Sequence, residues 1–289
     1  MATIEFSEEQ TMLMDTAVDF CRKHSPLEIV RAQIDQPQGI DPSVWQEMID
    51  LGWLGITVPE PYGGLGLSLA DAVPIAESMG RHLMGSPFMA TTLATQALIQ
   101  CGSEAQKEQW LPQIAAGSAA SLALTEEDGN WNLTEVASFA EMHDGKLLLT
   151  AKKCFVLDAP QAAVILFSAQ VEGAARLIAV SADQLPEGAL VRETVIDETR
   201  RSYTLEVDAL ALPADQLLPG SDFHGIEHAA LLLLSAEMSG GLAGVLHVII
   251  DYLTTRKQFD QYIGSYQSLK HPTVQILLSM EACRSHLYR

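Results

Sequence analysis

The stretch SLALTEEDGNWN, residues 121–132, marks a change in the pattern of the sequence. Before it, residues 1–118 carry helix-start signals and apolar residues at helical spacing; Ser7 followed by Gln10, for example, predicts a capping box. After it come short runs rich in Val, Leu and Ile, separated by Gly, Pro, Asp and Asn. This stretch therefore divides a helical part of the chain from a part that we expect to form strands.

The apolar runs recur about every ten residues, a spacing typical of a β-sandwich or barrel. The runs are SLALTEE, KLLLTAKKCFVL, AAVILFSAQ, RLIAVSA and SYTLEVDALAL. The helical pattern then returns and predicts two long helices over residues 228–253 and 265–289. This order predicts an α+β protein of three consecutive units: a helical domain over 1–118, a β domain over 119–222 and the first helices of a bundle over 223–289.

Local signals also predict where helices of the first domain begin and end. Asp41 and Pro42 form an N-cap followed by a proline at the first helical position, and Gly52 is placed to end that helix. Ser68 with Asp71 predicts a second helix start.

Composition excludes several classes of function. The chain has 37 acidic and 17 basic residues, and a net charge of −20 argues against binding to the phosphate backbone of a nucleic acid. Ser, Glu and Gly interrupt the longest apolar stretches, so we expect no membrane span. The N-terminal residues lack the character of a signal or transit peptide. The four cysteines lie far apart without a CxxC pair or a nearby His, which predicts free thiols, no metal site and a cytoplasmic location.

A helical apolar stripe runs to the end of the sequence without a Gly, Pro or Asn stop signal. We therefore expect the helical pattern to continue beyond Arg289, or a partner to complete the fold. The stripe consists of Ile276, Leu277, Met280, Cys283 and Leu287.

Four segments, taken in order, resemble the acyl-CoA dehydrogenases. They are LGWLGITVPEPYGGLGLS (51–68), GSEAQKEQWLPQIAAGS (102–118), ALTEEDG (123–129) and RKQFDQYIGSYQS (256–268). The resemblance covers the whole chain and stops before the family's usual end. It implies the family's fold, in which FAD is bound between an N-terminal helical domain, a β domain and a C-terminal helical bundle.

The resemblance also implies a reaction: α,β-dehydrogenation of an acyl-CoA thioester to the trans-2-enoyl-CoA, as in lipid degradation. In this chemistry a carboxylate removes the proton α to the carbonyl, and the flavin accepts a hydride from the β carbon. The implied partners are an electron-transferring flavoprotein or a similar acceptor, and further subunits of a homo- or hetero-oligomer.

By resemblance, one group of residues contacts the flavin within the same subunit. Thr125, with Leu124 beside it, corresponds to the position that approaches the flavin ring; a threonine closing a turn is the alternative. Phe155 stands where the family commonly has a tryptophan beside the flavin, followed by Val156 and Leu157. A core phenylalanine in a strand is the alternative for Phe155.

A second group lies in the segment RKQFDQYIGSYQ. Arg256 offers a planar fork suited to a pyrophosphate, Gln258 an amide and Phe259 an aromatic face. A solvated helix terminus is the alternative. The resemblance implies that these three residues, with Ile263 and Gln267, reach the ADP half of FAD bound by a neighbouring subunit.

The sequence departs from the family pattern at several of these positions. Trp131 occupies the place of a serine in the glycine-rich turn at the cofactor, and Leu157 that of a Thr or Ser. Asp260 and Gln261 stand where the family usually has Gly-Lys, which removes a cation. We therefore expect the cofactor site of this chain to be altered.

By resemblance, the catalytic base is expected beyond Arg289. A minority of the family carries it on the first helix of the C-terminal domain, at a position that corresponds to Ala230, followed here by Leu231. Glu227 and Glu237 are out of register with that position, and we expect solvent-facing or structural roles for them.

The same helix is unusually rich in small residues: Ser235, Ala236, Ser239, Gly240, Gly241, Ala243 and Gly244. Each glycine inside a helix costs about 1 kcal/mol relative to alanine, so another interaction must offset that cost. Close packing of a neighbouring helix and a wide acyl pocket for a bulky substrate are the two interpretations.

Two functions follow from the sequence. The first is an FAD-dependent acyl-CoA dehydrogenase. The second is a non-catalytic partner subunit of a heteromeric dehydrogenase that contributes Arg256, Gln258 and Phe259 to FAD held by another subunit. A nucleic-acid-associated member of the family is disfavoured by the negative charge.

Overall fold

The computed structural model describes residues 7–36 and 39–289, and the chain divides into two compact units. The helical unit comprises Met1–Arg31, Asp71–Met84 and Leu231–Arg289; the sheet unit comprises Ala32–Ala70 and Gly85–Ala230.

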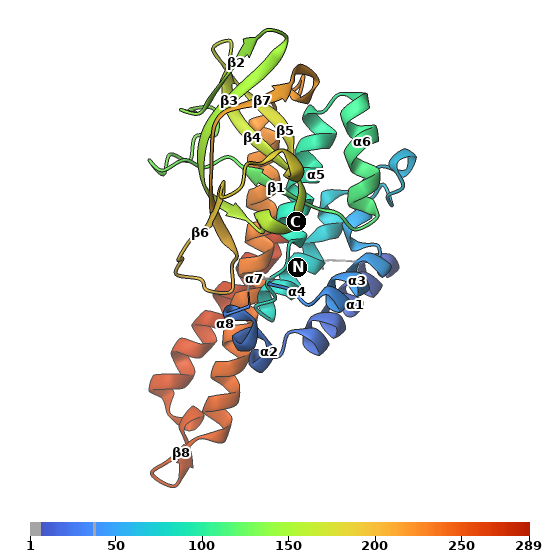
Figure 1. The fold of residues 1–289 in the computed structure, drawn as a ribbon. Coiled ribbons are helices and arrows are strands. Elements are labelled where there is room, and N and C mark those ends of the chain that lie inside the picture. The colour runs from blue at the N-terminus through green and yellow to red at the C-terminus, as the bar shows by residue number, and fades with distance from the viewer. Residues whose placement is uncertain (1–6, 37–38) are drawn as a thin grey trace. The chain divides into compact units, whose positions relative to one another are not determined.

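Helices precede and follow the strands along the chain (Figure 1). The N-terminal helices are α1 (Glu8–His24), α2 (Leu27–Ile34), α3 (Pro42–Asp50), α4 (Val73–Arg81), α5 (Phe88–Cys101) and α6 (Glu104–Ala115). The strands of the main sheet are β1 (Ala119–Ala123), β2 (Phe139–His143), β3 (Lys146–Leu157), β4 (Ala162–Val171), β5 (Ala174–Ser181), β6 (Leu190–Arg192) and β7 (Ser202–Pro213). Then come α7 (Phe223–Thr255), the hairpin strands β8 (Lys257–Gln258) and β9 (Gln261–Tyr262), and α8 (Gln267–Leu287).

This order confirms the predicted fold class, with a mixed β-sheet as its middle part. Secondary structure changes between α6 and β1 and again at the start of α7, close to the predicted boundaries at residues 118 and 222. The division into three domains stays a prediction, since the compact units follow other boundaries.

The predicted helix-start signals are confirmed in α1 and α3. The Ser7 hydroxyl accepts a hydrogen bond from the Gln10 backbone N–H at 3.1 Å, and the Gln10 side chain accepts one from the Ser7 N–H. Asp41 caps α3 by accepting from the Ser43 N–H at 2.8 Å, and Gly52 has a left-handed backbone with φ of 75° just past its end. Asp71 lies in a 3₁₀ turn that leads into α4.

The main sheet has seven strands. Six of them follow the order β1-β4-β2-β3-β7-β6, and the seventh, β5, pairs with β4 outside this order. Strand β4 runs parallel to β1 and β2, while the other pairs are antiparallel. Val164 and Leu166 of β4 pack with α5 and α6, whereas Ile165 and Phe167 point into a core on the opposite face. Burial on both faces explains why this strand is apolar at nearly every position.

The sequence pattern predicts five of these seven strands but not β2 and β6. In β2, Phe139 and Met142 are both exposed, so the strand lacks an alternating pattern. Strand β6 has only three residues, which is too short to show a period.

In the helical unit, α4 and α7 approach so closely that only glycine fits at the crossing. A Cβ atom on Gly240 would collide with the backbone carbonyl of Glu77, and one on Gly80 with that of Glu237. Gly244 meets the Arg81 carbonyl in the same way. Close helix packing is therefore the reason for the glycines at 240 and 244, and these two do not line an acyl pocket.

The carboxylate of Glu77 on α4 also ties down the end of α8. It accepts hydrogen bonds from Arg284 Nε at 2.9 Å, from the Tyr288 hydroxyl at 2.6 Å and from the Ser239 hydroxyl at 3.3 Å. Burial, together with the bond to Glu77, raises the pKa of Tyr288. Glu77 of α4, Ser239 of α7 and the C-terminal end of α8 are thus joined at one half-buried carboxylate.

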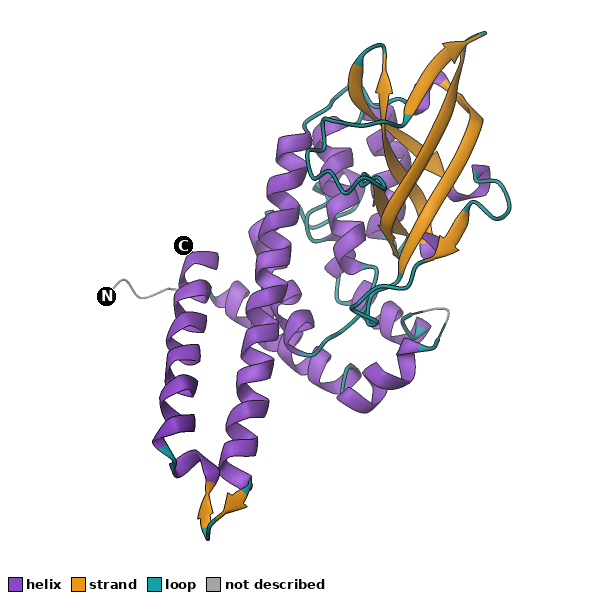
Figure 2. Cartoon of the chain, turned by 90° about the vertical axis from the view of Figure 1, so that its left-hand side faces the viewer, coloured by secondary structure: helices purple, strands orange, loops and turns teal. Residues whose placement is uncertain are grey.

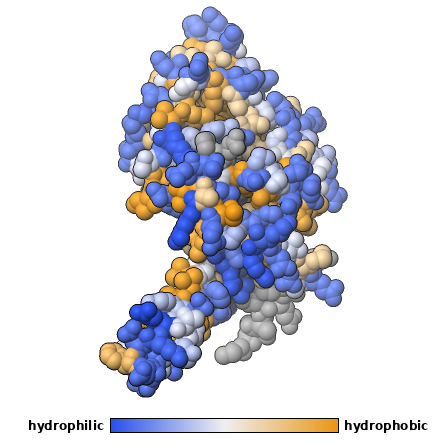
Figure 3. Space-filling model, turned by 60° about the horizontal axis from the view of Figure 1, so that its bottom comes forward, coloured by the Kyte–Doolittle hydropathy of each residue, from blue (hydrophilic) through white to orange (hydrophobic). Residues whose placement is uncertain are grey.

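Helices α7 and α8 run antiparallel and are joined by the β8–β9 hairpin, and we call residues 231–289 the C-terminal arm (Figures 1 and 2). Figure 3 shows hydrophobic side chains on the surface of this arm and a largely hydrophilic tip.

Helix α7 is long and apolar enough to span a membrane by length and composition, with a mean hydropathy of 1.7 over 18 residues. Because length and composition alone are weak evidence of a span, the expectation that the chain has no membrane span stays a prediction. Core helices of soluble proteins meet the same criterion, and α7 packs against α4 in the helical unit.

Substituting the two adjacent glycines of α7 separates packing from helix propensity. We expect Gly240→Ala to lower the free energy of unfolding by about 1–3 kcal/mol, because the new methyl group has no room against α4. Gly241→Ala is the control, because its Cβ would approach α4 only as far as ordinary contact, 3.8 Å from the Gly80 carbonyl oxygen. It should be neutral or stabilise the helix by up to about 1 kcal/mol. Urea unfolding measures both, and equal effects would contradict the close crossing.

Candidate flavin site

The structure brings the two predicted flavin-contact segments of the sheet unit together. Thr125 follows β1, and its carbonyl accepts a hydrogen bond from the Cys154 N–H at 2.9 Å. The Ser121 hydroxyl of β1 donates to the Leu157 carbonyl at 2.6 Å. The end of β1 and the end of β3 are therefore fixed side by side.

A β-bulge near the end of β3 turns Phe155 outward. Up to Lys153 the odd-numbered residues of this strand are buried, and continued alternation would bury Phe155 as well. The pairing between β3 and β7 slips between Lys153 and Val156, so that Val156 is buried and Phe155 is 54% exposed. Phe155 is thus not a core residue, and its ring presents an apolar face to whatever binds at this end of the sheet.

The other predicted residues of this segment differ in what they can offer a ligand. The Val156 side chain lies in the sheet core, which leaves its backbone for contact. Leu124 is half-buried beside the α5–α6 core. Leu157 is also half-buried and carries no hydroxyl. Thr125 is half-buried, and its hydroxyl makes no hydrogen bond with any residue that the structure describes, so it is free to bond a ligand.

Trp131 stands on a loop that is held by its own hydrogen bonds. The Glu135 carboxylate accepts from the side-chain amides of Asn130 and Asn132 at 2.9 and 2.8 Å, and Asn132 in turn accepts from Thr134. The indole is 78% exposed and is not packed into the sheet. The loop therefore presents Trp131 to the solvent in a defined position.

A buried ion pair that no sequence motif predicted anchors both ends of this loop. Glu126 accepts from Lys153 Nζ at 2.7 Å, from the N–H and hydroxyl of Ser138, and from the Ala137 N–H. The Lys153 side chain is 0% exposed and that of Glu126 12%. Lys153 lies on the buried face of β3 together with Leu147, and a lysine on the apolar side of an alternating strand is the signal that could have found the pair.

The pKa values of the pair reflect this environment. Burial favours the neutral form of Glu126, but the bonds from Lys153, Ser138 and Ala137 outweigh it and lower the pKa of the carboxyl to about 2. Burial lowers the pKa of the Lys153 ammonium, and the Glu126 carboxylate opposes this shift.

The second predicted group lies at the tip of the C-terminal arm. Residues 257–262 form a hairpin rather than a helix terminus, with Phe259 and Asp260 both left-handed at φ of 54° and 63°. The Phe259 ring is 88% exposed. The family's glycine after the phenylalanine fits this turn without strain, whereas Asp260 does not.

Arg256 at this tip has no side-chain partner among residues 7–36 and 39–289. Its neighbour Lys257 is engaged, because Lys257 Nζ lies 4.7 Å from the centre of the Tyr262 ring. The Gln258 carbonyl accepts from the Tyr266 hydroxyl at 3.0 Å, which braces the hairpin. Ile263 is half-buried and Gln267 exposed. The guanidinium and the aromatic ring are therefore both available to a ligand.

The alternative position of the catalytic base offers no ionisable group. Ala230 on α7 is half-buried and Leu231 is exposed. The Glu227 carboxylate oxygen Oε2 lies 3.6 Å from His224 Nδ1, one helical turn away on α7. The catalytic base stays a prediction for the sequence beyond Arg289.

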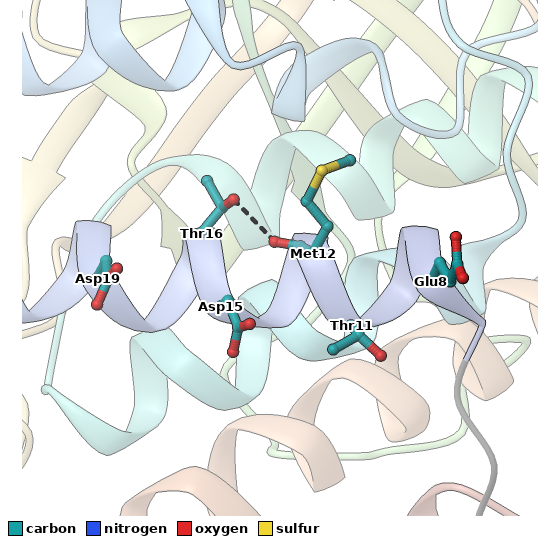
Figure 4. A pocket seen from close by; sticks show the side chains of 6 residues that line it. All are labelled: Glu8, Thr11, Met12, Asp15, Thr16 and Asp19. Atoms are coloured by element: carbon teal, nitrogen blue, oxygen red, sulfur yellow. Dashed lines mark hydrogen bonds between the residues drawn. The ribbon is translucent and has the colours of Figure 1, made fainter.

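The shallow depression that runs along α1 carries no comparable chemistry. It is lined by residues of that helix alone, and Figure 4 shows their side chains pointing to different sides. They are Glu8, Thr11, Met12, Asp15, Thr16 and Asp19. Among the described residues, no group of three or more His, Cys, Asp or Glu side chains is placed to hold a metal.

Comparison with known proteins assigns this architecture to one family. Residues 7–118 match the model of the acyl-CoA dehydrogenase N-terminal domain. Acyl-CoA dehydrogenase IpdE2 of Mycobacterium tuberculosis is 28% identical over 281 residues, which cover 96% of this chain and 74% of that protein.

Two solved structures share the whole fold. The Tcur3481-Tcur3483 steroid ACAD is 28% identical, with a TM-score of 0.87 over 97% of this chain and 76% of that one. An acyl-CoA dehydrogenase from Bacillus anthracis complexed with FAD is 22% identical, with a TM-score of 0.86 over 100% of this chain and 52% of that one. The fold and the ordered motifs are those of a family of flavoprotein oxidoreductases. Residues 7–118 belong to the acyl-CoA dehydrogenase N-terminal domain family, and the whole chain resembles acyl-CoA dehydrogenases in sequence and fold.

The family implies FAD, and several groups of this chain fit that cofactor. The Thr125 hydroxyl and the Arg256 guanidinium have no partner in the part of the chain that the structure describes. The rings of Phe155 and Phe259 are exposed at strained backbone positions, where binding of a planar ligand would bury them.

The Glu126–Lys153 pair makes the stability of the protein depend on acid pH. The pKa of Glu126 in the folded protein lies below its ordinary value of 4.5. The ionised carboxylate therefore stabilises the fold fully above pH 4.5, and this stabilisation is lost as the pH falls toward 2. We expect Glu126→Gln to lower the free energy of unfolding at pH 7 by an amount on the order of 3 kcal/mol. This difference from wild type should shrink as the pH falls below 4.5.

Urea unfolding between pH 7 and pH 3 measures this effect. Glu127→Gln is the control, since that neighbouring carboxylate is exposed and pairs only with the exposed Lys152. A difference between wild type and Glu126→Gln that does not change with pH would contradict the assigned ion pair.

Proposed function

We propose that this chain is a subunit of an FAD-dependent acyl-CoA dehydrogenase that converts an acyl-CoA thioester to the trans-2-enoyl-CoA. The observation that carries the proposal is the exposed hairpin, on which Arg256, Gln258 and Phe259 stand with the Arg256 guanidinium unpartnered in the described chain. Strained, exposed aromatic and cationic groups of this kind are typical of ligand-binding segments.

The residues of this chain have distinct roles in the proposed reaction. The Thr125 hydroxyl bonds an edge of the flavin ring, and Phe155 forms an apolar wall that excludes water from it. Arg256 bonds the pyrophosphate of a cofactor held mainly by a neighbouring subunit, and Phe259 packs on its adenosine half. When bound, FAD supplies the acceptor for the hydride that leaves the β carbon.

The α proton requires a carboxylate base, which we assign to the sequence beyond Arg289. The reduced flavin requires an acceptor, for which an electron-transferring flavoprotein or a similar protein is proposed. A cofactor shared between subunits requires an oligomer, and we propose a homo- or hetero-oligomer in the cytoplasm.

A second function is a non-catalytic partner subunit of a heteromeric dehydrogenase. Specific features favour it: Trp131 and Leu157 replace hydroxyl-bearing residues of the family's cofactor site, and Ala230 cannot act as a base. The similar steroid ACAD is named for two proteins, Tcur3481 and Tcur3483, which supports a heteromer for this chain as well.

The visible absorption spectrum of the purified chain distinguishes the two functions. A self-sufficient dehydrogenase subunit retains the yellow absorption of bound FAD when purified alone. A partner subunit yields flavin absorption only after an unlike subunit is added. Absence of flavin in both preparations would contradict both functions.

Removing the Arg256 guanidinium tests the hairpin directly. We expect Arg256→Ala to weaken FAD retention in the assembled protein about tenfold or more, because a charge-assisted bond to the pyrophosphate is lost. Lys257→Ala removes the same charge one residue away, where the ammonium stacks on Tyr262, and should have little effect. Flavin content is measured by absorbance after gel filtration, and an unchanged value in Arg256→Ala counts against the proposed contact.

A further inference from the structure

The structure assigns to Glu193 a role in positioning Phe155: its carboxylate holds the bulged end of β3 so that the Phe155 ring forms the wall of the flavin site. This inference rests on the proposed function for its ligand, but its geometric part stands on the sheet unit alone. Glu193 follows directly after β6 and carries no motif, so nothing in the sequence pattern singles it out.

The bulge gives Phe155 a backbone conformation that a residue with a Cβ atom rarely adopts. Its φ is 56°, in the left-handed region where glycine is favoured. The β3–β7 pairing slips at this point, so the Phe155 N–H has no strand partner. Such a conformation persists only where neighbouring groups hold it.

Glu193 supplies the missing acceptor. The Phe155 N–H donates to both carboxylate oxygens, at 3.2 and 3.3 Å. The same carboxylate accepts from the Ser202 hydroxyl at 2.6 Å and from the Thr204 hydroxyl at 2.8 Å, and the Glu193 N–H donates to the Ser202 carbonyl at 2.9 Å. Two hydroxyls of β7 thus aim the carboxylate at the bulge.

This arrangement connects Glu193 to the cofactor through one residue. With the N–H of Phe155 bound to Glu193, the side chain points away from the core and is 54% exposed. Without that acceptor, the strand would lower its free energy by returning to regular alternation. This return would turn Phe155 inward and displace Val156 from the core. Glu193 is therefore a positioning residue, which acts on a ligand only through the Phe155 ring.

The position of the ring is measured by ¹⁹F NMR of protein labelled with 4-fluorophenylalanine. The Phe155 resonance among the eight phenylalanines is identified by its loss in Phe155→Leu. We expect Glu193→Ala to shift or split this resonance. Glu193→Gln keeps a side-chain carbonyl for the Phe155 N–H and should have a smaller effect. Glu198→Ala is the control, because Glu198 is exposed in the same loop and makes no hydrogen bond in the described chain.

Binding of the cofactor is measured on the same variants by titration with FAD, followed through flavin fluorescence. We expect Glu193→Ala to raise the Kd for FAD about tenfold, Glu193→Gln less, and Glu198→Ala not at all. Thermal unfolding of each variant is recorded alongside, so that a loss of stability alone is recognised.

Each result has one meaning. An unchanged Phe155 resonance in Glu193→Ala overturns the positioning role, even if the variant unfolds at lower temperature. A shifted resonance with unchanged affinity for FAD overturns the connection to the flavin. If the wild-type chain binds no FAD, alone or with a second subunit, a shifted resonance still supports the contact of Glu193 with Phe155, and the proposed function is the part that fails.

Discussion

The buried ion pair between Lys153 and Glu126 is the interaction on which the proposed flavin site of the sheet unit depends. It joins β3 to the segment after β1 and, through Ser138 and Ala137, to the segment before β2. Removing one partner of a buried pair leaves an uncompensated charge, at a cost of about 3–5 kcal/mol. Thr125 precedes Glu126, and the loop with Trp131 follows it, so this pair adds an anchor to the hydrogen bonds that hold each of them.

Around this anchor the chain places aromatic residues in strained, exposed positions. Phe155 in the sheet unit and Phe259 in the helical unit both have left-handed backbones, and both rings are exposed. Exposed apolar surface and strained backbone each have an energetic cost, and their coincidence at two family cofactor positions is consistent with the proposed binding. The departures from the family are of another kind, since Trp131 and Leu157 change side-chain chemistry.

Much of the fold could be predicted because its signals are local. The capping box of Ser7, the N-cap of Asp41 and the apolar runs of β3 and β4 are contained in a few neighbouring residues. The candidate site was predicted less completely. Family motifs gave Thr125, Phe155 and Arg256, whereas Glu126, Lys153 and Glu193 become recognisable only when strands distant in sequence are brought together.

The sequence by itself determined the order of helices and strands, the family and the residues that the family uses for its cofactor. The tertiary structure decided which of these side chains are exposed and which are buried. Strict alternation along β3 would bury Phe155, but the slipped pairing with β7 moves each later side chain to the opposite face of the sheet. The glycines of α7 are likewise explained only by the carbonyl groups of α4. Both outcomes depend on contacts between segments far apart in the chain, which no local pattern contains.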